Sequence, residues 1–150
     1  GEGLRTVLWV AGCSHHCPQC HNPVTWDING GLVFDEQAKE ELFEELKKDY
    51  VSGVTFSGGD PFHLENREEI GALAKEIREK FPDKTIWLYT GYEWEEICHL
   101  SFLSNIDVIV DGKFKIEEKD NNLHWKGSAN QRVIDVKASL RAGEVRLYQE

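Results

Sequence analysis

The sequence contains no methionine, and it has only four cysteines and four prolines among its 150 residues. Three of the four cysteines are bunched together, which does not resemble the disulfide framework of a secreted protein. We therefore expect a reducing, cytoplasmic location. Because the chain begins at Gly1 and lacks Met, we also expect a short N-terminal segment to be missing.

Long apolar runs and basic residues are also scarce. No run approaches the roughly 18 apolar residues of a membrane span, and no signal peptide is visible. Lysine and arginine number 17 against 27 acidic residues, so the net charge is −10. Such a surface repels phosphate backbones and anionic lipids, which argues against nucleic acid and membrane partners. The acidic residues fall mostly in predicted helices, where a solvated helix face accounts for them.

Strand-like and helix-like segments alternate along the chain. Hydrophobic residues make up 40% of the sequence, and a chain of this length buries about 68–70% of its unfolded surface, so we expect one domain over residues 1–150. Apolar periodicity predicts helices over 36–50 and 70–81, with a short one at 93–100. Apolar and β-branched runs predict four strands, at 5–12, 53–59, 85–91 and 106–112. Two more short strands are predicted near the end of the chain, at 131–136 and 144–148.

This alternation predicts an α/β fold. Strands that are apolar on both faces and separated by amphipathic helices are typical of a mostly parallel sheet with helices outside it. The pattern alone does not choose between an open sheet and a partial barrel.

Cysteines at positions 13, 17 and 20 directly follow the first predicted strand, where sites of parallel α/β proteins gather. The C-x3-C-x2-C spacing can wrap three thiolates around one centre. One interpretation is a zinc site completed by a histidine, which would be His15, His16 or His21. The other is an iron–sulfur cluster that lacks one protein ligand and so leaves one iron open. Spacing alone leaves both open.

A glycine-rich turn, Ser57-Gly58-Gly59-Asp60-Pro61, ends the second predicted strand. The two glycines permit positive φ and a close approach of the backbone to a ligand. Asp60 has two possible roles: it can accept a hydrogen bond from an ammonium group, or it can cap a helix that starts at Pro61.

Together, "CSHHCPQC" and "SGGDP" resemble the motifs of the radical S-adenosylmethionine superfamily. The segments "GEGLRTVLWVAGC", "TWDINGG", "WLYTGY", "DVIVDGKF" and "WKGSANQRVIDV" resemble one family within it, the activating enzymes of the anaerobic (class III) ribonucleoside-triphosphate reductase. Two positions depart from the usual pattern. Gln19 stands where many members have an aromatic residue, and His21 stands where reductase activators often have Tyr.

The resemblance implies a partial (β/α)6 barrel, here abbreviated, in which Cys13, Cys17 and Cys20 hold a [4Fe-4S] cluster. The open iron then binds S-adenosylmethionine. One electron, supplied by flavodoxin or a ferredoxin, cleaves this cofactor to a 5′-deoxyadenosyl radical, which generates a glycyl radical on the reductase. The resemblance also implies that the reductase covers the open side of the site. The residues expected to contact the cofactor are Gln19, His21, Ser57, Gly58, Gly59, Asp60, Thr90 and Gly91.

Other residues carry weaker expectations. Tyr92 either lines the cofactor cavity with Thr90 and Gly91 or packs as an ordinary aromatic residue, and a salt bridge or hairpin accounts for Asp111 and Lys113. Cys98, on a short apolar helix, is expected to be a buried core thiol. Four residues fit the family pattern without an assigned role: Arg5, Asn130, Gln131 and Arg132.

Two other functions compete with this interpretation. A different small radical enzyme, such as a pyruvate formate-lyase activator or a carboxy-deazaguanine synthase, would share the cysteines and the glycine turn. A zinc-stabilised binding module would use the three cysteines and a histidine as ligands.

Overall fold

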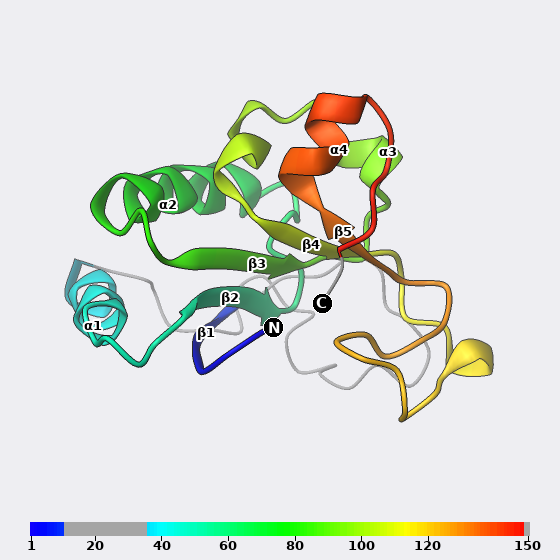
Figure 1. Cartoon of the computed structure of the whole chain (residues 1–150), viewed down its shortest axis with the longest axis horizontal. Helices are drawn as coiled ribbons and strands as arrows, with labels where there is room; N and C mark the ends of the chain where they lie inside the picture. Colours follow the sequence, from blue (N-terminus) through cyan, green and yellow to red (C-terminus); the bar gives the residue numbers. More distant parts are fainter. Residues whose placement is uncertain (11–35, 149–150) are drawn as a thin grey trace.

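The computed structural model describes residues 1–10 and 36–148 and is an α/β domain. Its strands form one five-stranded sheet in the chain order β1-β2-β3-β4-β5 (Figure 1). The first four strands are parallel, and β5 pairs with β4 in the antiparallel direction. The strands are β1 Arg5–Val10, β2 Gly53–Gly58, β3 Thr85–Tyr89, β4 Val108–Asp111 and β5 Arg132–Asp135.

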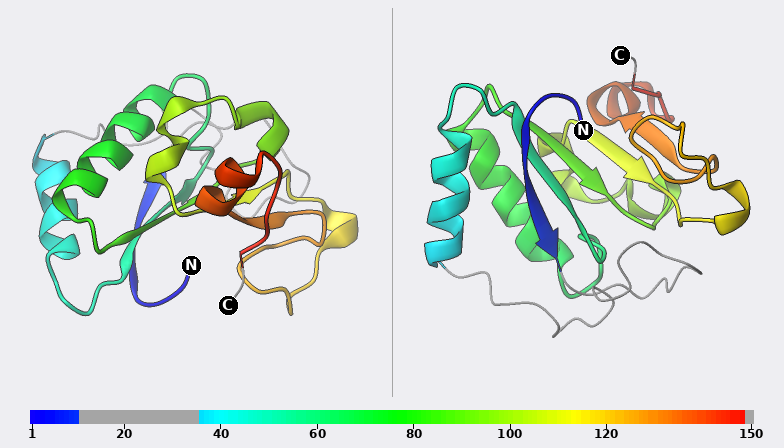
Figure 2. Two further views of the ribbon diagram at one scale, coloured as in Figure 1. Left: turned by 45° about the horizontal axis from the view of Figure 1, so that its top comes forward. Right: turned by 90° about the horizontal axis from the view of Figure 1, so that it is seen from below.

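The α-helices lie on one face of this sheet (Figure 2). Each contributes side chains to a single core together with alternate residues of the strands, such as Val54 and Phe56 of β2 and Ile86 and Leu88 of β3. The helices are α1 Glu36–Leu46, α2 Arg67–Lys80, α3 Trp94–Ile97 and α4 Val136–Ala142, with 3-10 turns η2 Ser101–Asn105 and η3 Ile116–Glu118. No helix in these two described segments is long and apolar enough to cross a membrane.

The opposite face of the sheet is closed only in part. Trp87, at the centre of β3, is 2% exposed, because two aromatic rings from elsewhere in the chain pack on it edge to face. The ring centroid of Trp125 lies 4.9 Å from that of Trp87, and the centroid of Tyr148 lies 5.2 Å away. Nearer to β1 the same face is open, since Trp9 is 60% exposed.

Arg5 fastens the amino ends of three strands. From β1 its guanidinium donates to the Thr55 hydroxyl and the Val54 carbonyl of β2, at 2.9 and 2.8 Å. It also donates to the hydroxyl and the carbonyl of Thr85 at the start of β3, both at 2.7 Å. Burial lowers the pKa of Arg5 to about 10. The residue thus has a structural role at the amino edge of the sheet.

The predicted α/β class and mostly parallel sheet are confirmed. The helix predicted over 36–50 ends at Leu46, and Tyr50 is 63% exposed instead of facing the core. Cys98 is exposed, so the prediction of a buried thiol is wrong. Helix α3 has only four residues and buries Trp94 and Ile97, which leaves the next residue, Cys98, facing outward.

The end of the chain also differs from the prediction. The predicted strand 131–136 corresponds to β5, but 144–148 makes only an isolated bridge between Leu147 and Ile134. Between them lies helix α4, which the apolar pattern did not reveal. Its start is capped by the Asp135 carboxylate, which accepts from the Ala138 amide, and its end by Gly143 in the left-handed region.

We predict that Arg5→Met lowers the free energy of unfolding by about 3 kcal/mol, because it leaves backbone and hydroxyl acceptors of β2 and β3 without their charged donor. Urea unfolding of the metal-free protein, followed by circular dichroism, measures this change. The matched control is Arg141→Ala on the exposed side of α4, for which we expect a change within about 0.5 kcal/mol. Equal stability of Arg5→Met and wild-type protein would contradict the proposed role.

Candidate functional site at the carboxyl edge of the sheet

Strands β1 to β4 are parallel, so the residues that follow them gather at one edge of the sheet. The glycine turn begins with the last two residues of β2, and Thr90, Gly91 and Tyr92 follow β3. Cys13 comes three positions after Val10, the last residue of β1. The predicted site residues Cys13, Cys17, Gln19, Cys20 and His21 lie outside the described residues.

The glycine turn lies against the end of β1. The Gly59 amide donates to the Val10 carbonyl at 2.7 Å. Gly58 has a φ of +101°, and a Cβ there would lie 2.6 Å from the same carbonyl oxygen, so only glycine fits this contact. Residues 57–59 are half-buried. Their backbone is therefore accessible at the point where the chain leaves β1 toward the cysteines.

Asp60 joins the loops that follow β2 and β3. Its carboxylate is 1% exposed. One oxygen accepts from the Phe62 amide at 2.9 Å and from the Thr90 hydroxyl at 2.8 Å, and the other accepts from the Gly91 amide at 2.9 Å. Because α2 begins only at Arg67, Asp60 is not a helix cap, and that alternative is wrong. Asp60 instead closes a local turn and ties it to the next strand.

The segment after β3 is held from two further directions. The Thr90 amide donates to the Val110 carbonyl of β4 at 3.0 Å, and the Thr90 hydroxyl accepts from the Tyr92 amide at 3.2 Å. Thr90 is buried, whereas Gly91 is half-buried at the edge. Tyr92 packs as expected: the Arg67 guanidinium lies 5.4 Å from its ring centroid.

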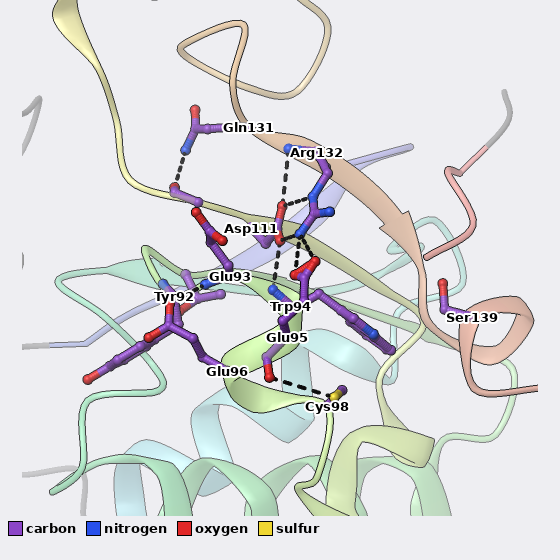
Figure 3. Close-up of polar contacts among 12 residues, drawn as sticks. Tyr92, Glu93, Trp94, Glu95, Glu96, Cys98, Asp111, Gln131, Arg132 and Ser139 are labelled. Carbon is purple, nitrogen blue, oxygen red and sulfur yellow. Dashed lines mark hydrogen bonds and ion pairs between the residues drawn. The ribbon is translucent and has the colours of Figure 1, made fainter. Parts of the chain in front are cut away.

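An ion-pair network follows β4 (Figure 3). The Asp111 carboxylate, 1% exposed, accepts from the Trp94 amide at 2.8 Å and from Arg132, whose Nη2 lies 2.5 Å away. Arg132 also contacts the Glu95 carboxylate at 3.0 Å. These two carboxylates raise the pKa of Arg132. Asp111 does form a salt bridge, but its partner is Arg132 and not Lys113, which is exposed. β4 and β5 pair as antiparallel strands that are joined by the long loop 112–131 and not by a tight hairpin.

Residues 112–131 form a loop that is held by its own polar side chains. The Gln131 amide group donates to the Gly112 carbonyl at 2.9 Å and accepts from the Gly127 amide at 2.9 Å. The Asn130 amide group donates to the Lys113 carbonyl at 2.8 Å and accepts from the Ser128 hydroxyl at 2.6 Å. Asn130, Gln131 and Arg132 therefore act as structural clasps. Sequence reasoning missed this role, although amide side chains beside glycines are a signal for loop closure.

Among residues 1–10 and 36–148, no group of three or more histidine, cysteine or acidic side chains is placed to hold a metal ion. The described part of the site thus consists of backbone at the glycine turn and of two buried carboxylates, Asp60 and Asp111, that fix the surrounding loops.

Comparison with known proteins adds to this geometry. The sequence profile of a family described as a 4Fe-4S single cluster domain matches residues 1–134, which favours the iron–sulfur interpretation over zinc. A protein of Enterobacteria phage T4 named anaerobic ribonucleoside-triphosphate reductase-activating protein is 44% identical over 133 residues, which cover 89% of this chain and 85% of the relative. Proteins of the same name from Haemophilus influenzae and Escherichia coli K12 are 40% and 39% identical over 137 residues, covering 89% of this chain and 88% and 89% of the relatives.

No solved structure matches the chain significantly. The family match nevertheless extends over most of the sequence and includes both the cysteine segment and the glycine turn. The chain therefore belongs to the 4Fe-4S single cluster domain family and, within it, to the anaerobic ribonucleoside-triphosphate reductase-activating proteins.

Proposed function

We propose that this chain is a radical S-adenosylmethionine enzyme that generates a glycyl radical on the anaerobic ribonucleoside-triphosphate reductase. The observation that carries the proposal is the contact of the glycine turn with the end of β1, from which the three-cysteine segment departs. This contact supports a shared site for a cluster and a cofactor. The match to reductase-activating proteins over 89% of the chain supports the choice of substrate.

In this proposal Cys13, Cys17 and Cys20 hold three irons of a [4Fe-4S] cluster, and the fourth iron is left for S-adenosylmethionine. When bound, the cluster and the cofactor together supply a 5′-deoxyadenosyl radical that removes a hydrogen atom from a glycine of the reductase. The accessible backbone of Ser57, Gly58 and Gly59 fits the methionyl end of the cofactor, because backbone donors and acceptors at a glycine turn can approach a ligand closely. Gln19 and His21 frame the cofactor beside the cluster.

The described side chains have the task of positioning. Asp60 keeps the loops after β2 and β3 in a fixed relation, so that Gly91 faces the same edge as the glycine turn. Asp111, at the end of β4, likewise fixes the start of β5 through Arg132 and the start of α3 through the Trp94 amide. Fixed loops matter because the radical acts only on atoms within contact distance, and small displacements of the reacting groups cost rate.

The five-stranded sheet corresponds, in this proposal, to an abbreviated partial (β/α)6 barrel that occupies residues 1–150 as a single domain. The electron comes from a low-potential donor such as flavodoxin or a ferredoxin, in the cytoplasm. The donor has to be of low potential because the sulfonium, which finally accepts the electron from the cluster, is difficult to reduce.

We predict that replacing Cys13, Cys17 or Cys20 singly by Ala abolishes 5′-deoxyadenosine formation and the glycyl radical, because two thiolates do not retain the cluster. Iron content, product analysis and electron paramagnetic resonance after anaerobic reconstitution measure the three losses. Cys98→Ala is the matched control, since this thiol is exposed directly after α3, and it is expected to behave like wild type. Cofactor cleavage at the wild-type rate in any of the three variants would refute the proposal.

We also predict that Asp60→Asn raises the KM for S-adenosylmethionine about tenfold while the iron content stays unchanged. The NH2 group that replaces one carboxylate oxygen cannot accept a hydrogen bond, so a donor such as the Gly91 amide is left unpaired and its segment loses its fixed position. Initial rates of 5′-deoxyadenosine formation at varied cofactor concentration measure this change.

Two controls accompany the Asp60 variant. Thr90→Ser keeps the hydroxyl that donates to Asp60 and should retain the wild-type KM. Asp83→Asn changes an exposed aspartate before β3 and should also have no effect. A wild-type KM for Asp60→Asn would show that the carboxylate bridge does not position the cofactor loops.

A further inference from the structure

The outer strand of the sheet exposes two large apolar side chains in a row. Val7 is 41% exposed and Trp9 is 60% exposed. Their neighbours Leu8 and Val10 pack against the core under the helices. Because side chains alternate along a strand, Val7 and Trp9 lie on the face of β1 that carries no helix. Single exposed apolar residues are ordinary on a protein surface, so the case for an interaction surface rests on what else Val7 and Trp9 offer.

The backbone of the same two residues points away from the sheet. The Leu4 carbonyl accepts from the amide of Ser52, just before β2, and the Val10 carbonyl accepts from the amide of Gly59, just after β2. The backbone groups of Leu4 and Val10 therefore point toward β2. Since backbone groups of successive residues point in opposite directions, those of Val7 and Trp9 are directed outward. No strand among the described residues pairs with this edge of β1. An extended segment can therefore add to it by main-chain hydrogen bonds.

This edge leads directly to the candidate site. Trp9 is in register with Ser57, the first residue of the glycine turn, and lies four positions before Cys13. Neighbouring strands are about 4.8 Å apart. A segment that lies along Val7 and Trp9 thus reaches the carboxyl edge of the sheet, where the cysteine segment and the glycine turn meet.

We propose that the outer edge of β1 at Val7 and Trp9 is the docking site for the extended, glycine-bearing segment of the reductase. The inference rests on the proposed function, because it requires a substrate that is a polypeptide. A hydrogen atom can be removed only from a glycine that comes into contact with the radical. The segment therefore has to reach the carboxyl edge of the sheet, and the outer edge of β1 leads there. The helices cover the other face of the sheet, and Trp125 and Tyr148 cover the centre of this one.

Tyr50 and Leu140, which are also exposed, do not offer the same combination. Tyr50, at 63% exposure, precedes β2 and so lies toward the amino edge. Leu140, at 41%, is on α4 beside the far strand of the sheet. Trp9 combines exposure, outward backbone groups and register with the glycine turn. Tryptophan is also the residue type that most often dominates binding energy at interfaces.

The test compares Trp9→Ala with Tyr50→Ala, which removes an equally exposed aromatic ring elsewhere. Both cluster-loaded proteins are titrated with the purified reductase, and affinity is measured together with the yield of glycyl radical by electron paramagnetic resonance. We expect Trp9→Ala to weaken binding on the order of 30-fold, as loss of an interface anchor does. Tyr50→Ala should bind like wild type, and Trp9→Phe should recover most of the affinity.

Further measurements keep the outcome clear. Circular dichroism and iron content establish that each variant is folded and loaded. Val7→Asp, on the same stripe of β1, should weaken binding as well, even if Trp9→Ala does not fold. Wild-type affinity for the reductase in Val7→Asp and in folded Trp9→Ala would overturn the inference. The inference would also be overturned if the Val7 and Trp9 variants lost only self-association, measured by sedimentation, and kept their affinity for the reductase. The surface would then bind a second copy of this chain.

The same experiment separates this inference from the proposed function. If the wild-type protein forms no glycyl radical on the reductase, the proposed function fails and the inference fails with it. If wild type forms the radical and the Trp9 and Val7 variants do so at the same reductase concentration, the function stands and only the docking site is wrong.

Discussion

The arrangement of the site depends on a buried carboxylate that joins two neighbouring loops. Asp60 is 1% exposed and accepts from Phe62 in its own turn and from Thr90 and Gly91 after the next strand. A buried charge of this kind is stable only when hydrogen bonds compensate for its lost hydration, so the loops have to remain in place around it. The hydrogen bonds of Asp60 therefore fix the C-terminal end of the glycine turn to the loop after β3. The φ of +101° at Gly58 brings the start of the turn against β1. In the proposed function, this bridge fixes the loops that face the cofactor.

The two edges of the parallel sheet have different roles. At the amino edge, Arg5 joins β1, β2 and β3 by hydrogen bonds whose acceptors are hydroxyls and carbonyls. No chemistry is assigned to this end, and a cation there can act as a fastener. At the carboxyl edge, Asp60 and Asp111 are acceptors for the loops that surround the site. The sheet is thus fixed at one end by the half-buried Arg5 and at the other by the buried Asp60 and Asp111, groups of opposite sign.

The sequence was sufficient to predict those features that depend on local pattern. Apolar runs revealed β1 to β4, and the glycine turn indicated the edge where Asp60, Thr90 and Gly91 now lie together. The roles of Arg5 and Gln131 were not predictable, because their partners are 50 to 80 positions away in one case and depend on a folded loop in the other. Helix α4 was missed because it has only seven residues and little apolar periodicity, although Asp135 and Gly143 at its ends are ordinary capping signals. Cys98 was misplaced because one position along a short helix decides between core and solvent.

An open sheet face is well suited to an enzyme whose substrate is another protein. A small molecule can be enclosed by loops, but a glycine in a folded partner has to be brought in together with its neighbours, so part of the wall has to be supplied by that partner. Leaving Trp9 60% exposed sacrifices hydrophobic stabilisation in the free enzyme. The same surface recovers this free energy only when an extended segment covers it. A narrow stripe such as Val7 and Trp9 suits a transient encounter, since small interfaces are typical of such complexes. Strand addition then supplies orientation through the backbone, while one aromatic side chain serves as the anchor of the interface.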